Sequence, residues 1–232
     1  MIRCIAFDFD GTLALSNAIK RDSFFQVGRC LGDVDKVLDS VLASKPGDRT
    51  RIFSLLIKTL QGQGQLPQGK DAEAWIKDLV DRYTAECEER IAACHEVPGT
   101  RTTLELLSSQ GYSLFVNSAT PTQTLQRVLV SRRLDGYFQA TLGGPASKVQ
   151  NLKEILSLHG SAPGALAFVG DNEVDRAAAV EIGCRFIGIE NEFSGYSHSP
   201  ETLIVDMSGL PSALDAIQAP ARMKLSGGLR HD

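Results

Sequence analysis

The sequence lacks paired cysteines, a strong excess of either charge and a long apolar run. Its five cysteines are scattered without a C-x-x-C pair, which argues against a zinc site or a disulfide framework and fits a reduced compartment. The net charge of −4 gives no electrostatic reason to expect nucleic acid or an anionic membrane as a partner. Asp8 interrupts the first apolar run too early for a signal peptide, and no segment is apolar enough to span a bilayer. We therefore expect a cytoplasmic protein that binds neither nucleic acid nor membrane.

The distribution of apolar residues divides the chain into three pieces. A strand is expected over residues 2–7, and residues 14–94 show apolar residues at helical spacing without a convincing strand. From about residue 98 onward, helix and strand patterns alternate, which predicts a doubly wound α/β fold with a parallel sheet. We expect a catalytic core formed by residues 1–13 and 95–217, an inserted all-helical cap over 14–94, and a flexible tail over 218–232.

Several elements can be placed within this frame. The last cap helix is predicted to bury one stripe of side chains, namely Trp75, Leu79, Tyr83, Cys87 and Ile91. In the core, strands are expected over 113–117, 165–169, 185–189 and 203–205, and helices over 104–108, 123–134 and 149–159. The segment 143–145, Gly-Gly-Pro, is predicted to be a turn.

Two acids follow the first strand directly. Side chains alternate along an extended chain, so Asp8 and Asp10 are expected to point the same way and to share one cation. Carboxylate oxygens suit Mg²⁺, which is commonly completed by substrate phosphate and water. Gly11 permits a sharp turn, and Thr12 adds a hydroxyl group at the same point. The alternative is an ordinary polar turn after a strand.

Further polar residues stand where later strands end. In an open parallel sheet, ligands bind at the carboxyl ends of the strands. Ser118 and Ala119 follow the strand at 113–116, and Asp171, Asn172 and Asp175 follow the strand at 165–169. Lys148 lies between these two groups, at the start of a predicted helix. Taken singly, a helix cap, a solvated lysine or an acid in a first helical turn would explain each of them.

In this order, Asp8-x-Asp10-Gly11-Thr12, Ser118, Lys148 and Gly170-Asp171-x-x-x-Asp175 resemble the four motifs of the haloacid dehalogenase-like superfamily of hydrolases. The resemblance covers the whole core, and the helical insertion is similar to that superfamily's cap between its first two motifs. Members with this layout mostly hydrolyse phosphate monoesters with Mg²⁺. Asn172 departs from the Asp or Ser that is common after the Gly-Asp pair, and this leaves the fine coordination open.

The resemblance implies a role for each motif residue. Asp8 would attack phosphorus as the nucleophile, and Asp10 would serve as general acid and base. Thr12, Ser118, Lys148 and the backbone of Ala119 would bind the phosphoryl oxygens. Asp8, Asp10 and Asp171 would hold the metal. Asp175 would hold Lys148 or a metal-bound water, and Asn172 could hydrogen-bond a metal-bound water.

The expected function is a Mg²⁺-dependent phosphatase acting on a small soluble phosphate ester, such as phosphoglycolate or a sugar phosphate. A phosphomutase shares the motifs, and a non-catalytic phosphate-binding module is the alternative from a different class. In the cap, Arg49 and Arg51 lie in a basic stretch over 45–51 that is hypothesised to contact the substrate, although a solvated helix start fits equally well. A monomer or a homodimer is expected.

Overall fold

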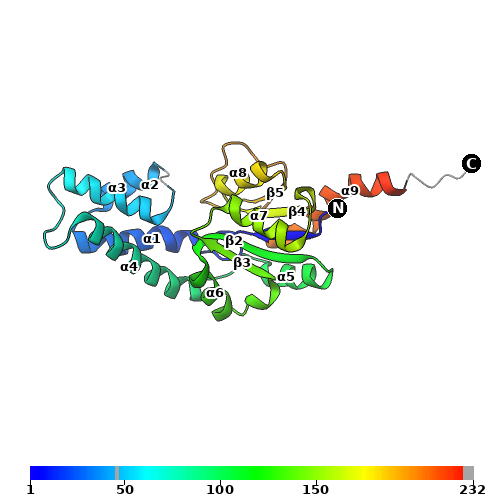
Figure 1. Cartoon of the computed structure of the whole chain (residues 1–232), viewed down its shortest axis with the longest axis horizontal. Coiled ribbons are helices and arrows are strands. Elements are labelled where there is room, and N and C mark those ends of the chain that lie inside the picture. The colour runs from blue at the N-terminus through cyan, green and yellow to red at the C-terminus, as the bar shows by residue number, and fades with distance from the viewer. Residues whose placement is uncertain (45–46, 227–232) are drawn as a thin grey trace, which may run out of the picture. The chain divides into compact units, whose positions relative to one another are not determined.

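The computed structural model describes residues 1–44 and 47–226, the last seven of these as backbone only, and it divides the chain into two compact units (Figure 1). Unit 1 consists of Met1–Ser16 and the chain from Cys94 onward, and unit 2 is Asn17–Ala93. Whereas the sequence placed the insertion at residues 14–94, the structure places its limits slightly inside these positions.

Within the described residues, unit 1 is built on one six-stranded sheet in the order β3-β2-β1-β4-β5-β6. The strands are β1 (Cys4–Phe7), β2 (Ser113–Pro121), β3 (Ala140–Gly144), β4 (Leu166–Gly170), β5 (Arg185–Ile189) and β6 (Leu203–Ile204). All neighbouring strands pair in parallel. From β1 the chain forms β2 and β3 on one side, and it then crosses back to form β4, β5 and β6 on the other side. The strand order therefore reverses at β1. This confirms the predicted doubly wound α/β fold.

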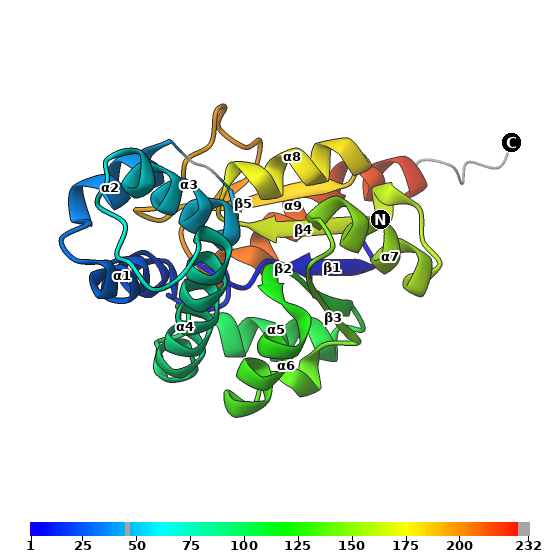
Figure 2. The same cartoon turned by 60° about the vertical axis from the view of Figure 1, so that its left-hand side comes forward.

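Helices cover both faces of this sheet (Figure 2). On one face lie α5 (Thr100–Ser109) and α6 (Thr122–Ser131), and on the other lie α7 (Lys148–His159) and α8 (Glu173–Ile182). Short 3-10 turns span Asp135–Tyr137, Pro163–Ala165 and Met207–Gly209, and the helix α9 (Leu210–Ser226) packs against α5. Because both faces are covered, the central strands are apolar and buried at every position, as is typical of parallel sheets.

Alternation along the strands separates two apolar layers. Cys4 and Ala6 of β1 point to the α7 and α8 face, where they join Phe115 of β2 and Phe168 of β4 in one buried cluster. The helices contribute Leu152, Ile155, Ala178 and Ala179 to that cluster. The next strand position beyond Phe115 on this face is Asn117, a polar residue whose place is important for the site.

The structure corrects the predicted turn over residues 143–145. Gly143 and Gly144 end the strand β3, and the turn begins only at Pro145. This short edge strand carries two glycines and is mostly half-buried, so it has neither the alternation nor the composition that marks a strand. A Cβ atom on Gly143 would lie 2.2 Å from the carbonyl oxygen of Thr120, and glycine therefore allows the close approach of β2 and β3.

The structure also differs from the predicted flexible tail over 218–232. Helix α9 continues through residue 226, and the side chain of Gln218 is buried. Its Oε1 accepts a hydrogen bond from the backbone N–H of Ile2 at 3.1 Å, and its Nε2 donates to the hydroxyl of Tyr112 at 3.0 Å. Residues 227–232 of the predicted tail lie outside the described residues.

Unit 2 is helical throughout its described residues. It contains α1 (Asn17–Gly28), a 3-10 turn (Arg29–Leu31), α2 (Asp35–Ala43), α3 (Arg49–Gly62) and α4 (Ala72–Ala93). All five residues of the predicted stripe are buried in α4. Aromatic rings join three of the helices, because Phe24 of α1 stacks on Tyr83 of α4 at 4.2 Å and lies 5.4 Å from Phe53 of α3, measured between ring centroids. No helix in the described part of the chain combines the length and apolarity needed to cross a bilayer.

Candidate active site

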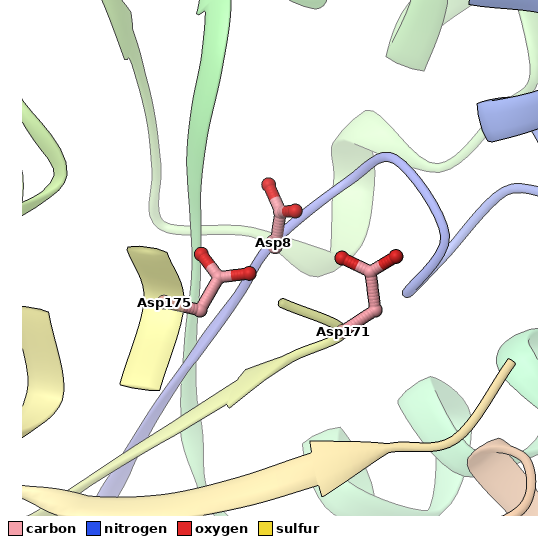
Figure 3. A group of neighbouring side chains, drawn as sticks. All are labelled: Asp8, Asp171 and Asp175. Atoms are coloured by element: carbon pink, nitrogen blue, oxygen red, sulfur yellow. The ribbon is translucent and has the colours of Figure 1, made fainter. Parts of the chain in front are cut away.

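Three buried aspartates meet at the carboxyl ends of β1 and β4 (Figure 3). Asp8 directly follows β1, Asp171 directly follows β4, and Asp175 lies in the first turn of α8. One carboxylate oxygen of each lies within 4.8 Å of those of the other two. The backbone N–H of Asp8 donates to the carbonyl oxygen of Val169 at 2.8 Å, so the pairing of the two strands fixes the cluster.

Lys148, the first residue of α7, provides a positive charge to this cluster. Its Nζ lies 2.8 Å from Oδ1 of Asp8 and also contacts Oδ1 of Asp175. Only 8% of its side chain is exposed, and burial alone would lower the pKa of Lys148, but the charges of Asp175 and Asp8 raise it above its usual value. The ammonium group therefore stays charged inside the core.

The acids respond to burial in the opposite way. Burial raises the pKa of Asp8 well above its usual value, and the neighbouring Asp175 and Asp171 add to this shift while Lys148 opposes it. Burial likewise raises the pKa of Asp175 to about 6, again opposed by Lys148. Burial and the neighbouring acids thus favour the neutral form of Asp8, and Lys148 favours its charged form.

Local sequence explains how Asp171 and Asp175 reach this place. Asn172 caps α8, and its Oδ1 accepts from the backbone N–H groups of Val174 and Asp175 at 2.9 and 3.2 Å. Its Nδ2 donates to Oδ1 of Asp171 at 3.0 Å. Gly170 has no Cβ atom where the side chain of Asp175 packs against it. The Gly-Asp-Asn sequence therefore lets both acids approach the end of β4.

The side chain of Asp10 lies outside this group of three, and the sharing of one cation by Asp8 and Asp10 stays a prediction. Its Oδ1 accepts from Ser16 Oγ at 2.6 Å, and its Oδ2 accepts from Thr120 Oγ1 at 3.2 Å. The reason is that β1 ends at Phe7, and residues 9–14 turn sharply around the carbonyl oxygen of Phe9. Alternation holds only in extended backbone, so it does not carry over to Asp10.

The predicted phosphate-binding residues lie at the ends of the same strands. Ser118 is buried in β2, and its Oγ accepts from the backbone N–H of Thr120 at 3.1 Å, while Ala119 between them is exposed. Because Thr120 also donates to Asp10, the ends of β1 and β2 are linked at this point. The hydroxyl of Thr12 is fully buried and has no hydrogen-bond partner among the residues that the structure describes.

Asn191 is a site residue that the sequence did not reveal. It follows β5, and its Nδ2 donates to Oδ2 of Asp171 at 3.0 Å and to the carbonyl oxygen of Gly11 at 3.3 Å. It therefore connects the loop after β1 with the acid after β4. The signal that would have found it is its position just past the end of a parallel strand, where ligands bind in such sheets.

The donor set fits a hard divalent cation. Three carboxylates face one ammonium: Lys148 contacts one oxygen of Asp8 and one of Asp175, and Oδ2 of Asp175 has no hydrogen-bond partner among the described residues. Mg²⁺ is typically held by one or two carboxylates together with water and phosphate oxygens. The group of three acids therefore suits a divalent cation.

Comparison with known proteins identifies the family. A family model described as haloacid dehalogenase-like hydrolase matches residues 5–189. The chain belongs to the haloacid dehalogenase-like hydrolase family. The match includes all the motif residues named above, and it confirms the resemblance and the enzyme class inferred from the sequence, a hydrolase of the phosphatase type.

Curated relatives and solved structures agree with this membership. A phosphoglycolate phosphatase from Mannheimia succiniciproducens is 30% identical over 206 residues, covering 81% of this chain and 85% of the relative. A predicted phosphoglycolate phosphatase from Haemophilus somnus has the same fold, with a TM-score of 0.73 at 20% identity over 92% of this chain and 98% of the other. CbbY from Rhodobacter sphaeroides, solved in complex with xylulose-(1,5)bisphosphate, has a TM-score of 0.73 at 18% identity over 90% and 96% of the two chains.

In this family member, the two predicted cap arginines both lie in unit 2. Arg49 is half-buried, its guanidinium donates to Thr84 Oγ1 at 3.1 Å, and it lies 5.9 Å from the ring centroid of Tyr83. Arg51 is exposed, and its backbone N–H donates to Asp48, which caps α3. Residues 45 and 46, which begin the predicted basic stretch, lie outside the described residues.

Proposed function

We propose that this protein is a Mg²⁺-dependent phosphatase that hydrolyses a small soluble phosphate monoester through an aspartyl phosphate on Asp8. The observation that carries the proposal is the buried contact of 2.8 Å between Lys148 Nζ and Asp8 Oδ1, in the same group of side chains as Asp171. A lysine and a metal beside one carboxylate allow that carboxylate to approach a phosphate dianion. Neither a structural turn nor a surface ion pair needs such a buried arrangement.

Asp8 and Asp171, together with Asp10 as the sequence predicts, are the residues that would hold Mg²⁺. When bound, the ion screens the repulsion between the anionic nucleophile and the anionic substrate. Asp175 holds the ammonium of Lys148 from the other side, which keeps its charge directed toward Asp8 and the phosphoryl group. Asn172 and Asn191 each donate to one oxygen of Asp171 and so orient this carboxylate.

The chemical steps follow from these positions. One carboxylate oxygen of Asp8 attacks phosphorus while the bond from phosphorus to the ester oxygen breaks, and Asp10 gives its proton to that leaving oxygen. Asp10 then takes a proton from a water molecule that attacks the aspartyl phosphate, which releases inorganic phosphate and restores Asp8. Ser16 and Thr120 bind the two oxygens of Asp10 and fix its direction.

Four groups would bind the equatorial phosphoryl oxygens, where charge spreads in the transition state. These are the ammonium of Lys148, the hydroxyls of Ser118 and Thr12, and the backbone N–H of Ala119. Thr12 is suited to this role because its buried hydroxyl has no other partner among the described residues. A substrate oxygen would satisfy this donor, and leaving it unpaired is costly.

Phosphoglycolate is the first candidate substrate, because relatives that include one 30% identical over 206 residues bear the name phosphoglycolate phosphatase. Sugar phosphates are the second, on the basis of the bisphosphate bound by the related fold of CbbY. Arg51, whose side chain is exposed at the start of α3, is our candidate for contacting the leaving group. Arg49 is the weaker candidate, because its guanidinium already binds within unit 2.

The test is a phosphatase assay with p-nitrophenyl phosphate, followed by a panel of phosphate esters. We expect turnover that depends on Mg²⁺, disappears on chelation with EDTA and returns when Mg²⁺ is added back. Asp8→Asn should lower kcat by about a thousandfold or more while the protein stays folded. Substantial turnover by Asp8→Asn would exclude the covalent mechanism. Transfer of the phosphoryl group to a second sugar hydroxyl, without release of phosphate, would instead indicate a phosphomutase.

A further inference from the structure

Two buried asparagines connect β2 to the start of α7. Asn117 is fully buried, and its Nδ2 donates to the backbone carbonyl oxygen of Lys148 at 3.0 Å. Its Oδ1 accepts from Nδ2 of Asn151, one turn further along α7, also at 3.0 Å. Asn151 is 1% exposed. A strand side chain thus makes two hydrogen bonds to the first turn of the helix that carries Lys148.

The bond to the carbonyl of Lys148 is not required by the helix. Inside an α-helix this carbonyl accepts from the N–H group four residues later, so the amide of Asn117 is a second donor to it. The helix start is already capped by Ser147, whose Oγ accepts from Gln150 N–H, while Gln150 Oε1 accepts from Ser147 N–H. The two asparagines therefore add a connection between helix and sheet that capping does not provide.

This connection determines where the reactive ammonium lies. Nζ of Lys148 is at the end of a flexible stem of four methylene groups, yet it lies 2.8 Å from Oδ1 of Asp8. If the backbone of Lys148 shifts relative to β1, the stem must change its rotamers to restore that distance. Buried amide groups without partners cost free energy, so the asparagine pair resists such a shift.

We propose that Asn117 and Asn151 form a positioning pair that holds Lys148 against Asp8 and thereby sets the rate of phosphoryl transfer. This inference rests on the proposed function, because it assigns the pair an effect on that reaction. The hydrogen bonds of the two side chains join them to each other and to the backbone of Lys148, and the pair acts through that backbone.

The alternative is that the buried asparagine pair contributes only to stability. Three variants separate a positioning role from a role in stability alone, namely Asn117→Leu, Asn151→Leu and Thr103→Val. Thr103→Val is the matched control, because the buried Thr103 Oγ1 donates to the carbonyl oxygen of Met207 at 2.9 Å, on α5 and away from the acids. All three variants are expected to melt at a lower temperature. Only the two asparagine variants should lower kcat, by about 10-fold to 100-fold for Asn117→Leu, as expected for a catalytic group displaced by up to an ångström.

A double-mutant cycle then tests whether the pair acts through Lys148. In a Lys148→Met background, whose residual turnover sets the baseline, Asn117→Leu should cause less than a twofold further loss of kcat. If Asn117→Leu does not fold, Asn151→Leu is carried through the same cycle.

Two results would overturn the inference. One is a kcat of both asparagine variants within twofold of the native value, and the other is an equal loss with and without Lys148. If the native protein itself shows no Mg²⁺-dependent turnover, the proposed function fails instead, so the two failures are distinguishable.

Discussion

A methyl group added at Gly170 is expected to disturb the active site by displacing Asp175. In Gly170→Ala, the new Cβ would lie 2.5 Å from Cβ and 2.6 Å from Cγ of Asp175. Ordinary contact begins at 3.4 Å, so Asp175 must move by about 0.9 Å. Its Cβ is bonded directly to the backbone of α8, and a change of rotamer therefore cannot relieve the contact. The first turn of α8 has to move instead.

The size of the effect follows from this displacement. Overpacking a tight interior costs about 1–3 kcal/mol of the free energy of unfolding. Because Lys148 binds Asp175, the shift also alters the ammonium beside Asp8, and a misplacement of about 1 Å at a reacting group can cost about 100-fold in rate. We expect Gly170→Ala to melt earlier and to lose at least about 10-fold in kcat.

Gly164→Ala is the matched control. A Cβ on Gly164 meets no atom within 4 Å, and this residue is not in the left-handed region. It should leave kcat unchanged, and its effect on stability should be neutral or a gain of about 0.4–1 kcal/mol. Circular dichroism follows the melting of the whole chain, while the single tryptophan, Trp75, reports on unit 2. If Gly170→Ala melts with the control and keeps the native kcat, the packing argument is refuted.

Two further predictions concern Asp171 and the helical unit. Asn191→Ala removes a hydrogen-bond donor to Asp171. We therefore expect the affinity for Mg²⁺, measured by calorimetry, to fall about 10-fold. An unchanged affinity would contradict the orienting role of Asn191. Arg51→Ala should raise KM for the preferred phosphate ester and leave the fluorescence melting curve unchanged. Arg49→Ala should lower that melting temperature, because it loses the bond to Thr84. The substrate contact proposed for Arg51 fails if Arg51→Ala leaves KM unchanged.

Much of the site could be predicted because of the parallel sheet. Asp8, Ser118 and Asp171 each follow an apolar run, and parallel strands end at one edge, so their neighbourhood follows from the order of elements. Lys148 could be added because it is the first residue of a helix that starts at that edge. The buried stripe on α4 could also be predicted, because the spacing of apolar residues along a helix depends on nothing outside the helix.

The remaining features depend on the fold in three dimensions. Strand alternation was extended to Asp10, whereas β1 ends at Phe7, so the contacts of Asp10 with Ser16 and Thr120 could not be predicted. In the sequence, Asn117 is indistinguishable from any other residue of a predicted strand. Its hydrogen-bond partners on α7 are determined by the packing of that helix on β2. Gln218 lies in a stretch that reads as polar and proline-containing, and only its bonds to Ile2 and Tyr112 show that the helix is docked.

The insertion of the helical unit directly after β1 also affects the order in which the chain acquires structure during synthesis. β1 is central, pairing with β2 on one side and β4 on the other, and β2 begins only at Ser113. As the polypeptide leaves the ribosome, the local contacts of residues 17–93 can form while this apolar strand still has no neighbour. This strand is thus paired on both sides only after β2 and β4 have been synthesised, and chaperones that bind short apolar segments would meet it before then.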